Sequence, residues 1–123
     1  MAVRTGVYER IKTFGNQGHV VTWSGLTQAS LDTGDPCEMI GSSDRSVHVR
    51  GTFGAGGNLV IEGSNDGVNY TPLADPQGTA LNFTAEKIES VLELVRYIRP
   101  RVTAGDGTTS LVVVMLLRNP RRG

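Results

Sequence analysis

Short stretches in which hydrophobic and polar residues alternate recur along the chain, with turn-forming residues between them. A period of two is typical of β-strands, because successive side chains of a strand point to opposite faces of its sheet. In 46–53, for example, Val47 and Val49 share one face and His48 lies on the other. The pattern predicts strands at 19–26, 37–41, 46–53, 58–64, 79–84, 92–102 and 110–118, and one more that starts near residue 70.

The connections between these stretches have the composition of turns. In GAGG (54–57), Gly56 and Gly57 can take the positive φ of a tight hairpin. In VIEGSNDGVNYTPL (60–73), the Asn-Asp-Gly sequence favours a turn, after which Tyr70 is predicted to pack back onto the body of the protein. We interpret both stretches as turns required by the fold.

Three features of the pattern are less regular. Ile88, Val91, Leu92 and Val95 fit a helical stripe as well as a strand, so we interpret 85–90 as a loop or single turn, with a strand beginning near Val91. Pro100 cannot donate a backbone hydrogen bond, which places its strand at a sheet edge or breaks it there. The continuous apolar run of 110–118 predicts a strand buried on both faces.

About eight short strands without a long helix indicate an all-β protein, an antiparallel β-sandwich. We favour a jelly roll, with an immunoglobulin-like sandwich as the second topology. The strands occupy one domain, 19–118. The segments outside them, 1–18 and 119–123, are predicted to be extended arms, the second a basic tail.

Charge is distributed unevenly although the chain has no net charge. Residues 1–12 carry three basic side chains against one acidic, and 96–123 carry six arginines against Asp106. Between them, 13–95 holds three basic and ten acidic residues. Basic ends on an acidic body could bind nucleic acid or join neighbouring subunits, and the zero total leads us to predict no nucleic-acid partner.

No recognisable constellation for chemistry is present. Cys37 is the single cysteine, so neither an internal disulfide nor a zinc cluster can form, and we expect a half-buried structural thiol. His19 and His48 are the only histidines, and neither lies in a catalytic or zinc-binding motif. The acidic stretches 32–38 and 64–67 do not fit a twelve-residue calcium loop. We therefore predict no enzyme, no metal and no cofactor.

The chain also lacks the features of membrane and secreted proteins. No apolar run approaches the ~20 residues of a transmembrane helix. The N-terminal stretch MAVRTGVYER has no apolar centre of the kind that a secretory signal contains. We expect no membrane partner.

Two stretches, IEGSNDGVNYTPL (61–73) and VRYIRPRVT (95–103), resemble the core signature of discoidin-like, galactose-binding-type jelly rolls. In that family a strand ending in Ser-x-Asp-Gly turns into an aromatic residue, and a later strand reads Arg-Tyr-Ile/Val-Arg. The matching positions are Ser64, Asp66, Gly67, Tyr70, Arg96, Tyr97, Ile98 and Arg99. They belong to the family's scaffold, so the resemblance implies a fold. The family's frequent disulfide is missing here.

Most of the chain, including GNLVIEGSNDGVNY and RYIRPRVTAGDGTTSLVVVMLLR with its basic ends, is similar to head decoration, or cement, proteins of tailed bacteriophages. This resemblance implies a structural virion protein, made in the host cytoplasm, that binds the exterior of an icosahedral capsid. It also implies the major capsid protein as partner, bridging of neighbouring copies of it, and a homodimer or other homo-oligomer. The alternative from another class is a carbohydrate-binding module, which would need exposed rings among Tyr8, Trp23, Tyr70 and Tyr97.

The two ends and the strand RYIRPRV (96–102) are the candidate partner-binding segments. Arg99 and Arg101 fall on one face of this strand and Arg96 on the other, where they are either solvated or meet acidic groups of a neighbouring subunit. In the N-terminal segment, Val3, Val7, Tyr8, Ile11 and Phe14 either anchor an arm on the partner or add an edge strand to the sandwich. The predicted partner-binding residues are Val3, Arg4, Val7, Tyr8, Arg10, Arg99, Arg101, Arg121 and Arg122.

Overall fold

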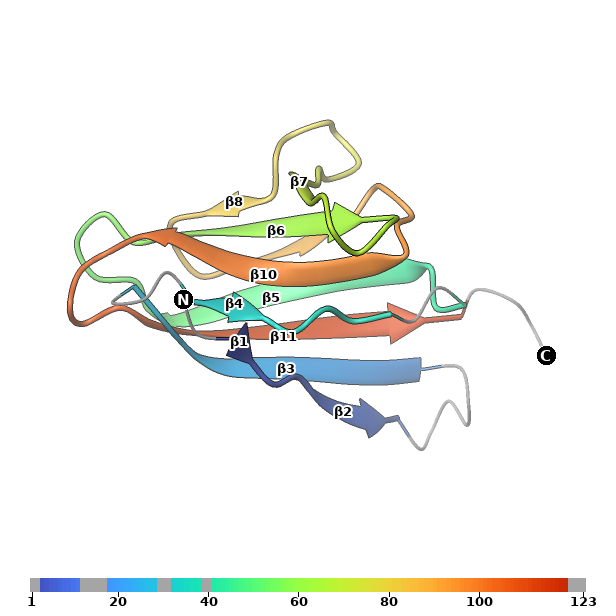
Figure 1. Cartoon of the computed structure of the whole chain (residues 1–123), viewed down its shortest axis with the longest axis horizontal. Helices are drawn as coiled ribbons and strands as arrows, with labels where there is room; N and C mark the ends of the chain where they lie inside the picture. Colours follow the sequence, from blue (N-terminus) through green and yellow to red (C-terminus); the bar gives the residue numbers. More distant parts are fainter. Residues whose placement is uncertain (1–2, 12–17, 29–31, 39–40, 120–123) are drawn as a thin grey trace.

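The computed structural model describes residues 3–11, 18–28, 32–38 and 41–119 (Figure 1). Within these ranges the chain is all-β, and its two sheets pack against each other. All strand pairs are antiparallel except that of β1 with β4. The predicted antiparallel β-sandwich is confirmed. None of the described segments is a helix long and apolar enough to cross a membrane.

The two sheets, which we name sheet A and sheet B, are built from the strands drawn in Figure 1, in which β9 is the strand without a label. Across sheet A lie β1 (Val3–Arg4), β4 (Thr33–Gly34), β10 (Tyr97–Ala104), β6 (Asn58–Ser64) and β7 (Thr71–Pro72), and β8 (Asn82–Phe83) also pairs with β6. Across sheet B lie β2 (Val7–Arg10), β3 (Gly18–Thr27), β11 (Ser110–Arg118), β5 (Asp44–Thr52) and β9 (Lys87–Ser90).

The order of the strands is that of a jelly roll. From β3 onward the chain passes back and forth between the sheets, apart from the step from β6 to β7 and β8. The last strand, β11, returns to lie beside β3, and β10 lies beside β4. Two nested Greek keys of this kind define the topology, so the jelly roll favoured by the sequence is confirmed.

A hydrophobic core fills the space between the sheets. Its largest fully buried side chains are Trp23, Leu26, Leu59, Ile61, Leu81, Ile98, Leu111, Met115 and Leu117. In β3 two residues, Ser24 and Gly25, lie opposite the single Val112 of β11. Gly25 has a φ of 69°, a left-handed conformation that glycine adopts without strain, and the extra residue turns Leu26 back into the core.

The N-terminal segment adds an edge strand to each sheet. β1 pairs with β4 in sheet A, and β2 pairs with β3 in sheet B. Asp35 holds the crossing between them, because its Oδ1 accepts from the backbone N–H of Gly6 at 2.6 Å and from Trp23 Nε1 at 3.0 Å. Of the two alternatives for residues 3–10, the structure therefore has the edge strand. Phe14 lies outside the described residues.

The strands predicted at 19–26, 46–53, 58–64 and 110–118 are confirmed by β3, β5, β6 and β11. The strand predicted at 37–41 is not found in the described residues of that range, 37, 38 and 41. The chain pairs earlier, at Thr33–Gly34, and Cys37 forms only an isolated bridge with Ile98. The reason is Trp23, since a Cβ on Gly34 would lie 2.5 Å from its ring, and only glycine lets β4 approach so closely.

The loop predicted for 85–90 and the strand start at Val91 are also wrong. β9 covers Lys87–Ser90 and pairs with β5, whereas β10 begins only at Tyr97. The residues of the apparent helical stripe do not share one buried face, because Val91 is buried but Ile88 and Leu92 are exposed. The strand predicted at 79–84 is shorter than expected, Asn82–Phe83, with Leu81 and Phe83 both in the core.

Two predictions about burial within sheets are wrong. Pro100 lies inside sheet A, between β4 and β6. The neighbouring N–H groups of Ile98 and Val102 donate to the carbonyls of Cys37 and Asp32. Pro100, which has no N–H, lies between these two bonds at a gap in the pairing with β4, so no hydrogen bond is lost. The run 110–118 is buried on its inner face only, since Leu116 on the outer face is 42 % exposed.

Candidate interaction surfaces

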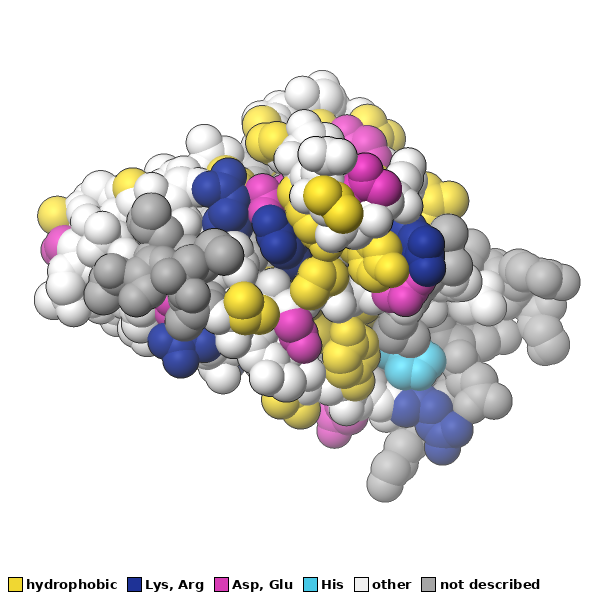
Figure 2. All heavy atoms as spheres, in the orientation of Figure 1, with side chains coloured by type: hydrophobic (Ala, Val, Ile, Leu, Met, Phe, Trp, Pro, Cys, Tyr) yellow, Lys and Arg dark blue, Asp and Glu magenta, His cyan; other side chains and the backbone are white. Residues whose placement is uncertain are grey.

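The outer face of sheet A carries a cluster of charged and aromatic side chains, which we name the arginine platform: Glu62, Tyr70, Arg99 and Arg101. Arg99 lies directly opposite Glu62 in the pairing of β10 with β6. Its Nε donates to Glu62 Oε1 at 2.8 Å, and Arg101 Nε donates to Glu62 Oε2 at 3.0 Å. In Figure 2, charged side chains of both signs and hydrophobic ones lie close together over the strands of sheet A.

The platform holds a buried carboxylate between two partly exposed cations. The side chain of Glu62 is 4 % exposed, whereas those of Arg99 and Arg101 are 22 % and 38 % exposed. Two positive charges thus share one negative charge, and the guanidinium groups reach the surface. Paired charge-assisted hydrogen bonds fix both arginines in place before any partner arrives.

The turn after β6 positions the aromatic part of the platform. Asp66 Oδ1 accepts from the N–H groups of Val68 and Asn69, both at 2.8 Å, and from the Ser64 hydroxyl. These bonds hold the pKa of the Asp66 carboxyl well below its usual range. The chain's own donors therefore saturate this carboxylate, which supports the interpretation of the stretch as a turn and leaves little room for a calcium ion.

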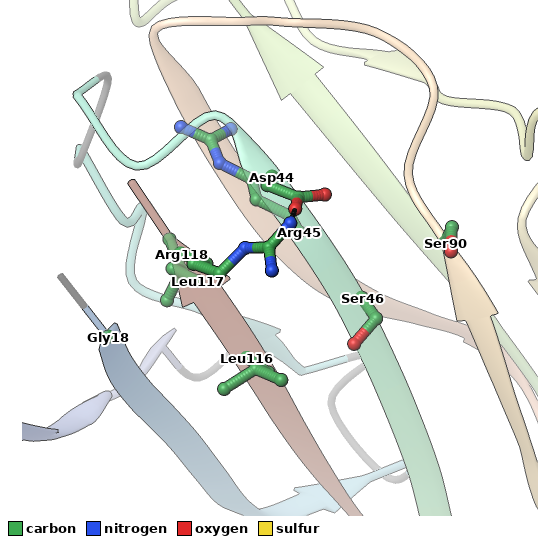
Figure 3. A pocket seen from close by; sticks show the side chains of 8 residues that line it. All are labelled: Gly18, Asp44, Arg45, Ser46, Ser90, Leu116, Leu117 and Arg118. Atoms are coloured by element: carbon green, nitrogen blue, oxygen red, sulfur yellow. Dashed lines mark hydrogen bonds and ion pairs between the residues drawn. The ribbon is translucent and has the colours of Figure 1, made fainter. Parts of the chain in front are cut away.

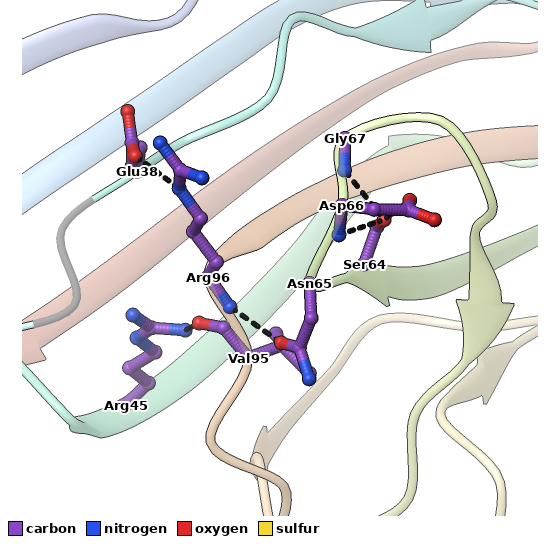
Figure 4. A network of polar contacts seen from close by, with 8 residues as sticks. All are labelled: Glu38, Arg45, Ser64, Asn65, Asp66, Gly67, Val95 and Arg96. Carbon is purple, nitrogen blue, oxygen red and sulfur yellow. Dashed lines mark hydrogen bonds and ion pairs between the residues drawn. The ribbon is translucent and has the colours of Figure 1, made fainter.

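Beyond this turn the ring of Tyr70 lies under Arg99, 3.7 Å from its guanidinium carbon, a cation–π contact. At the neighbouring end of β10, Arg96 Nε donates to Glu38 at 2.6 Å, and the Arg96 backbone N–H donates to Asn65 (Figure 4). The positions that carry the discoidin-like resemblance thus meet at one corner of the sandwich.

The structure divides the predicted partner-binding residues between several places. Val3, Thr33 and Arg101 are neighbours across sheet A, so Val3 extends the face of the platform. Arg4 lies near this edge and binds Asp32, with Nη2–Oδ2 at 2.9 Å. Arg99 and Arg101 both bind an acidic group, but that group, Glu62, is in their own chain. Sequence reasoning did not place Glu62 or Tyr70 among the partner-binding residues, because their contacts with the arginines depend on strand register.

The other predicted residues lie away from the platform. Val7, Tyr8 and Arg10 belong to β2 at the edge of sheet B. Tyr8 is partly covered there, and burial together with a hydrogen bond to Cys37 raises the pKa of its hydroxyl far above the ordinary value. Arg121 and Arg122 lie outside the described residues.

A second surface, which we name the sheet B face, is the outer side of the five strands of sheet B. Its apolar side chains are Val7, Val20, Ile88, Val112, Val114 and Leu116. Val7 is 66 % exposed, Ile88 60 % and Leu116 42 %. The sequence does indicate apolar residues on this surface, because both faces of the strand 110–118 carry them. The same pattern also predicts that both faces are buried, so it could not identify an exposed surface.

One end of the sheet B face is hollowed. Leu116, Ser46 and Ser90 line a shallow depression of about 330 Å³ together with Asp44 and Arg118, which form an ion pair (Figure 3). Arg45 lies at its base, 3 % exposed, and its Nε donates to the Ser42 carbonyl at 3.0 Å. Burial lowers the pKa of this arginine from its usual value.

The side chains that could take part in catalysis or metal binding are either buried, paired with another residue, or distant from one another. Cys37 is fully buried, whereas the sequence predicted a half-buried thiol. His48 Nε2 lies 3.0 Å from Glu86 Oε2 on the sheet B face. Within the described ranges no three metal-binding side chains gather into a site. Trp23 is only 1 % exposed, so its ring cannot stack on a sugar.

In comparisons with protein-family models, with curated proteins and with solved structures, nothing matches this chain.

Proposed function

We propose that this chain is a structural protein without enzymatic activity, which binds the outer surface of an icosahedral phage capsid and holds neighbouring major capsid proteins together. The choice of a capsid as partner comes from the similarity of the sequence to phage cement proteins. The observation that supports a protein-binding role is the arginine platform on the outer face of sheet A.

The platform has the composition and geometry of a protein-binding surface. Arginine and tyrosine are enriched among the residues that dominate binding energies. Arg99 and Arg101 share one carboxylate, so the cluster attracts an acidic group on a partner. Their fixed positions reduce the conformational entropy lost on binding. Val3, 59 % exposed, supplies apolar area beside them.

The carbohydrate-binding alternative gains no support from the aromatic side chains. Sugar recognition needs a ring with a free face, but Trp23 is in the core and Arg99 stacks on Tyr70. Tyr97 is half-buried, and Arg96 lies 5.0 Å from the centroid of its ring. Tyr8 at the edge of sheet B is 46 % exposed, and this single ring is too little to argue for a sugar site, so we propose no second function.

The proposal is tested by adding the purified chain to particles assembled from the major capsid protein encoded near its gene, followed by electron cryomicroscopy. Density for the sandwich across subunit joints is expected. Arg101→Gln should lower occupancy at least tenfold, while Lys87→Gln, which removes the same charge from the exposed edge strand β9, should not. Bare particles at saturating chain concentration would overturn the proposal, and equal occupancy of the two variants would overturn the role of the platform.

A further inference from the structure

The sheet B face shows an ordered pattern of side chains across its five strands. The register places Val7, Thr22, Val114, His48 and Ile88 side by side in one row. A second row contains Glu9, Val20, Leu116, Ser46 and Ser90. In the third row, Val112 lies beside Arg50. The middle strand, β11, therefore contributes an apolar residue to each of these three rows, and at the end of the face Arg118 lies between Gly18 and Asp44.

In the first row, the sequence of apolar and polar side chains is the same when read from either end. Val7 and Ile88 occupy its ends, polar Thr22 and His48 come next, and Val114 is central. A two-fold rotation about an axis along β11 exchanges β3 with β5 and β2 with β9. A face with this symmetry is complementary to itself, which is the requirement for an isologous dimer.

We propose that the sheet B face is a self-association surface, on which a second copy of this chain packs face to face about a two-fold axis along β11. Val7 then lies opposite Ile88 of the second copy, and Thr22 lies opposite its His48. Leu116 and Val114 each meet their own counterparts near the axis. Apolar groups face apolar groups along the first row.

The second row is compatible with the same axis. Val20 lies opposite Ser46 of the second copy, and Glu9 lies opposite its Ser90, whose hydroxyl can donate to the carboxylate. No two like charges face each other in these rows, and a like-charge contact would be costly. The proposed dimer thus satisfies the apolar and polar positions of these two rows, and Arg118, which lies on the axis beyond them, keeps its ion pair with Asp44.

The area of the face fits a dimer of modest affinity. Five strands about 4.8 Å apart span about 24 Å, and six residues at about 3.3 Å span about 20 Å. The two copies together would bury about 1,000 Å², near the lower limit for specific interfaces. We therefore expect dissociation at micromolar concentrations. The proposal does not depend on capsid binding, since it concerns the opposite sheet and the isolated chain.

Sedimentation equilibrium of the full chain from about 1 µM to 1 mM tests the proposal directly. A concentration-dependent monomer–dimer equilibrium is expected, and a monomer throughout would overturn it. Leu116→Glu should weaken the dimer at least tenfold, and Ile88→Lys at the exposed edge does so with less risk to folding. The matched control is Val68→Lys, which places the same charge at a valine 78 % exposed in the turn after β6. Equal weakening by the control would also overturn it.

The two-fold axis has its own test, a charge-pair rescue. Val7→Lys and Ile88→Glu should each weaken the dimer about tenfold, because each places a charge against an apolar group. In the double variant, the introduced lysine of each copy faces the introduced glutamate of the other, and affinity should return to within about threefold of the original. Circular dichroism checks that each variant is folded. A double variant as weak as the product of the singles would rule out the axis along β11.

Discussion

The guanidinium of Arg99 stacks on the ring of Tyr70 at 3.7 Å, yet the hydroxyl of the same tyrosine is buried and has no hydrogen-bond partner among the residues that the structure describes. The ring therefore contributes to stability, whereas the hydroxyl does not. Tyr70→Phe should keep or raise the free energy of unfolding, by up to about 1 kcal/mol, because it removes an unsatisfied polar atom. Tyr70→Leu should lower it by about 1 kcal/mol through loss of the cation–π contact. Urea unfolding measures both, and a Phe variant less stable than the Leu variant would contradict this account.

Glu62→Gln removes the carboxylate that Arg99 and Arg101 share. Breaking a buried ion pair costs about 3–5 kcal/mol, but both arginines reach solvent here, so we expect a loss of about 2 kcal/mol. Glu9→Gln, on an exposed strand, is the control and should change stability by less than about 0.5 kcal/mol. The comparison is made by urea unfolding at low salt, and equal effects of the two changes would refute the importance of the platform to stability.

Three glycines separate the effect of backbone conformation from that of space. Gly67 has a φ of 79°, and a Cβ on it would lie 3.1 Å from the Tyr97 ring. Gly56 has a φ of 69° and open space, and Gly107 has open space without a positive φ. Alanine should therefore cost about 2 kcal/mol at 67, about 1 at 56 and almost nothing at 107. Thermal unfolding checks the order of the three costs, and a reversed order would contradict the prediction.

Asp106 makes stability depend on acid pH. Hydrogen bonds from Thr108 and from the Ala55 N–H lower the pKa of its carboxyl to about 2. The unfolded chain, with an ordinary pKa near 4, binds the proton first, so the contribution is complete above about pH 4 and disappears as the pH falls through 2. The unfolding free energy of Asp106→Asn should therefore fall less steeply than that of the original chain between pH 4 and pH 2. Parallel curves would contradict the prediction.

Asp35→Ala should loosen the N-terminal strands selectively. The side chain accepts from the Gly6 N–H and from Trp23 Nε1, and both bonds are lost together. Hydrogen exchange should show protection lost at residues 7–10 of β2 while β5 and β6 stay protected. Asp44→Ala, at an exposed ion pair, is the control. Uniform loss of protection would show that β1 and β2 are not a separable unit.

Much of the fold could be predicted because the long strands carry their own side-chain pattern. Val47 and Val49 alternate with polar neighbours, and the apolar run of β11 can only be a strand among short turns. β4 carries no such pattern, because Thr33 and Gly34 are placed by backbone pairing and by the ring of Trp23. Its position follows from neighbours that are distant in sequence.

The surfaces were predictable only in part for the same reason. Alternation alone places Arg99 and Arg101 on one face of β10, and this is correct. That Glu62 lies between them depends on the register of β6 against β10. The exposed apolar residues of β11 could not be told from core residues, because valine and leucine give the same signal whether a face is covered by the same chain or is open.

The crossing of the N-terminal segment from β1 to β2 has a mechanical consequence. Because β1 is hydrogen-bonded to one sheet and β2 to the other, tension applied at Val3 loads both sheets at once. The two short ladders would have to slide past their neighbours, and the bonds of Asp35 to Gly6 and Trp23 resist this movement. Residues 3–10 thus act as a tether that ties the two layers of the sandwich together under load.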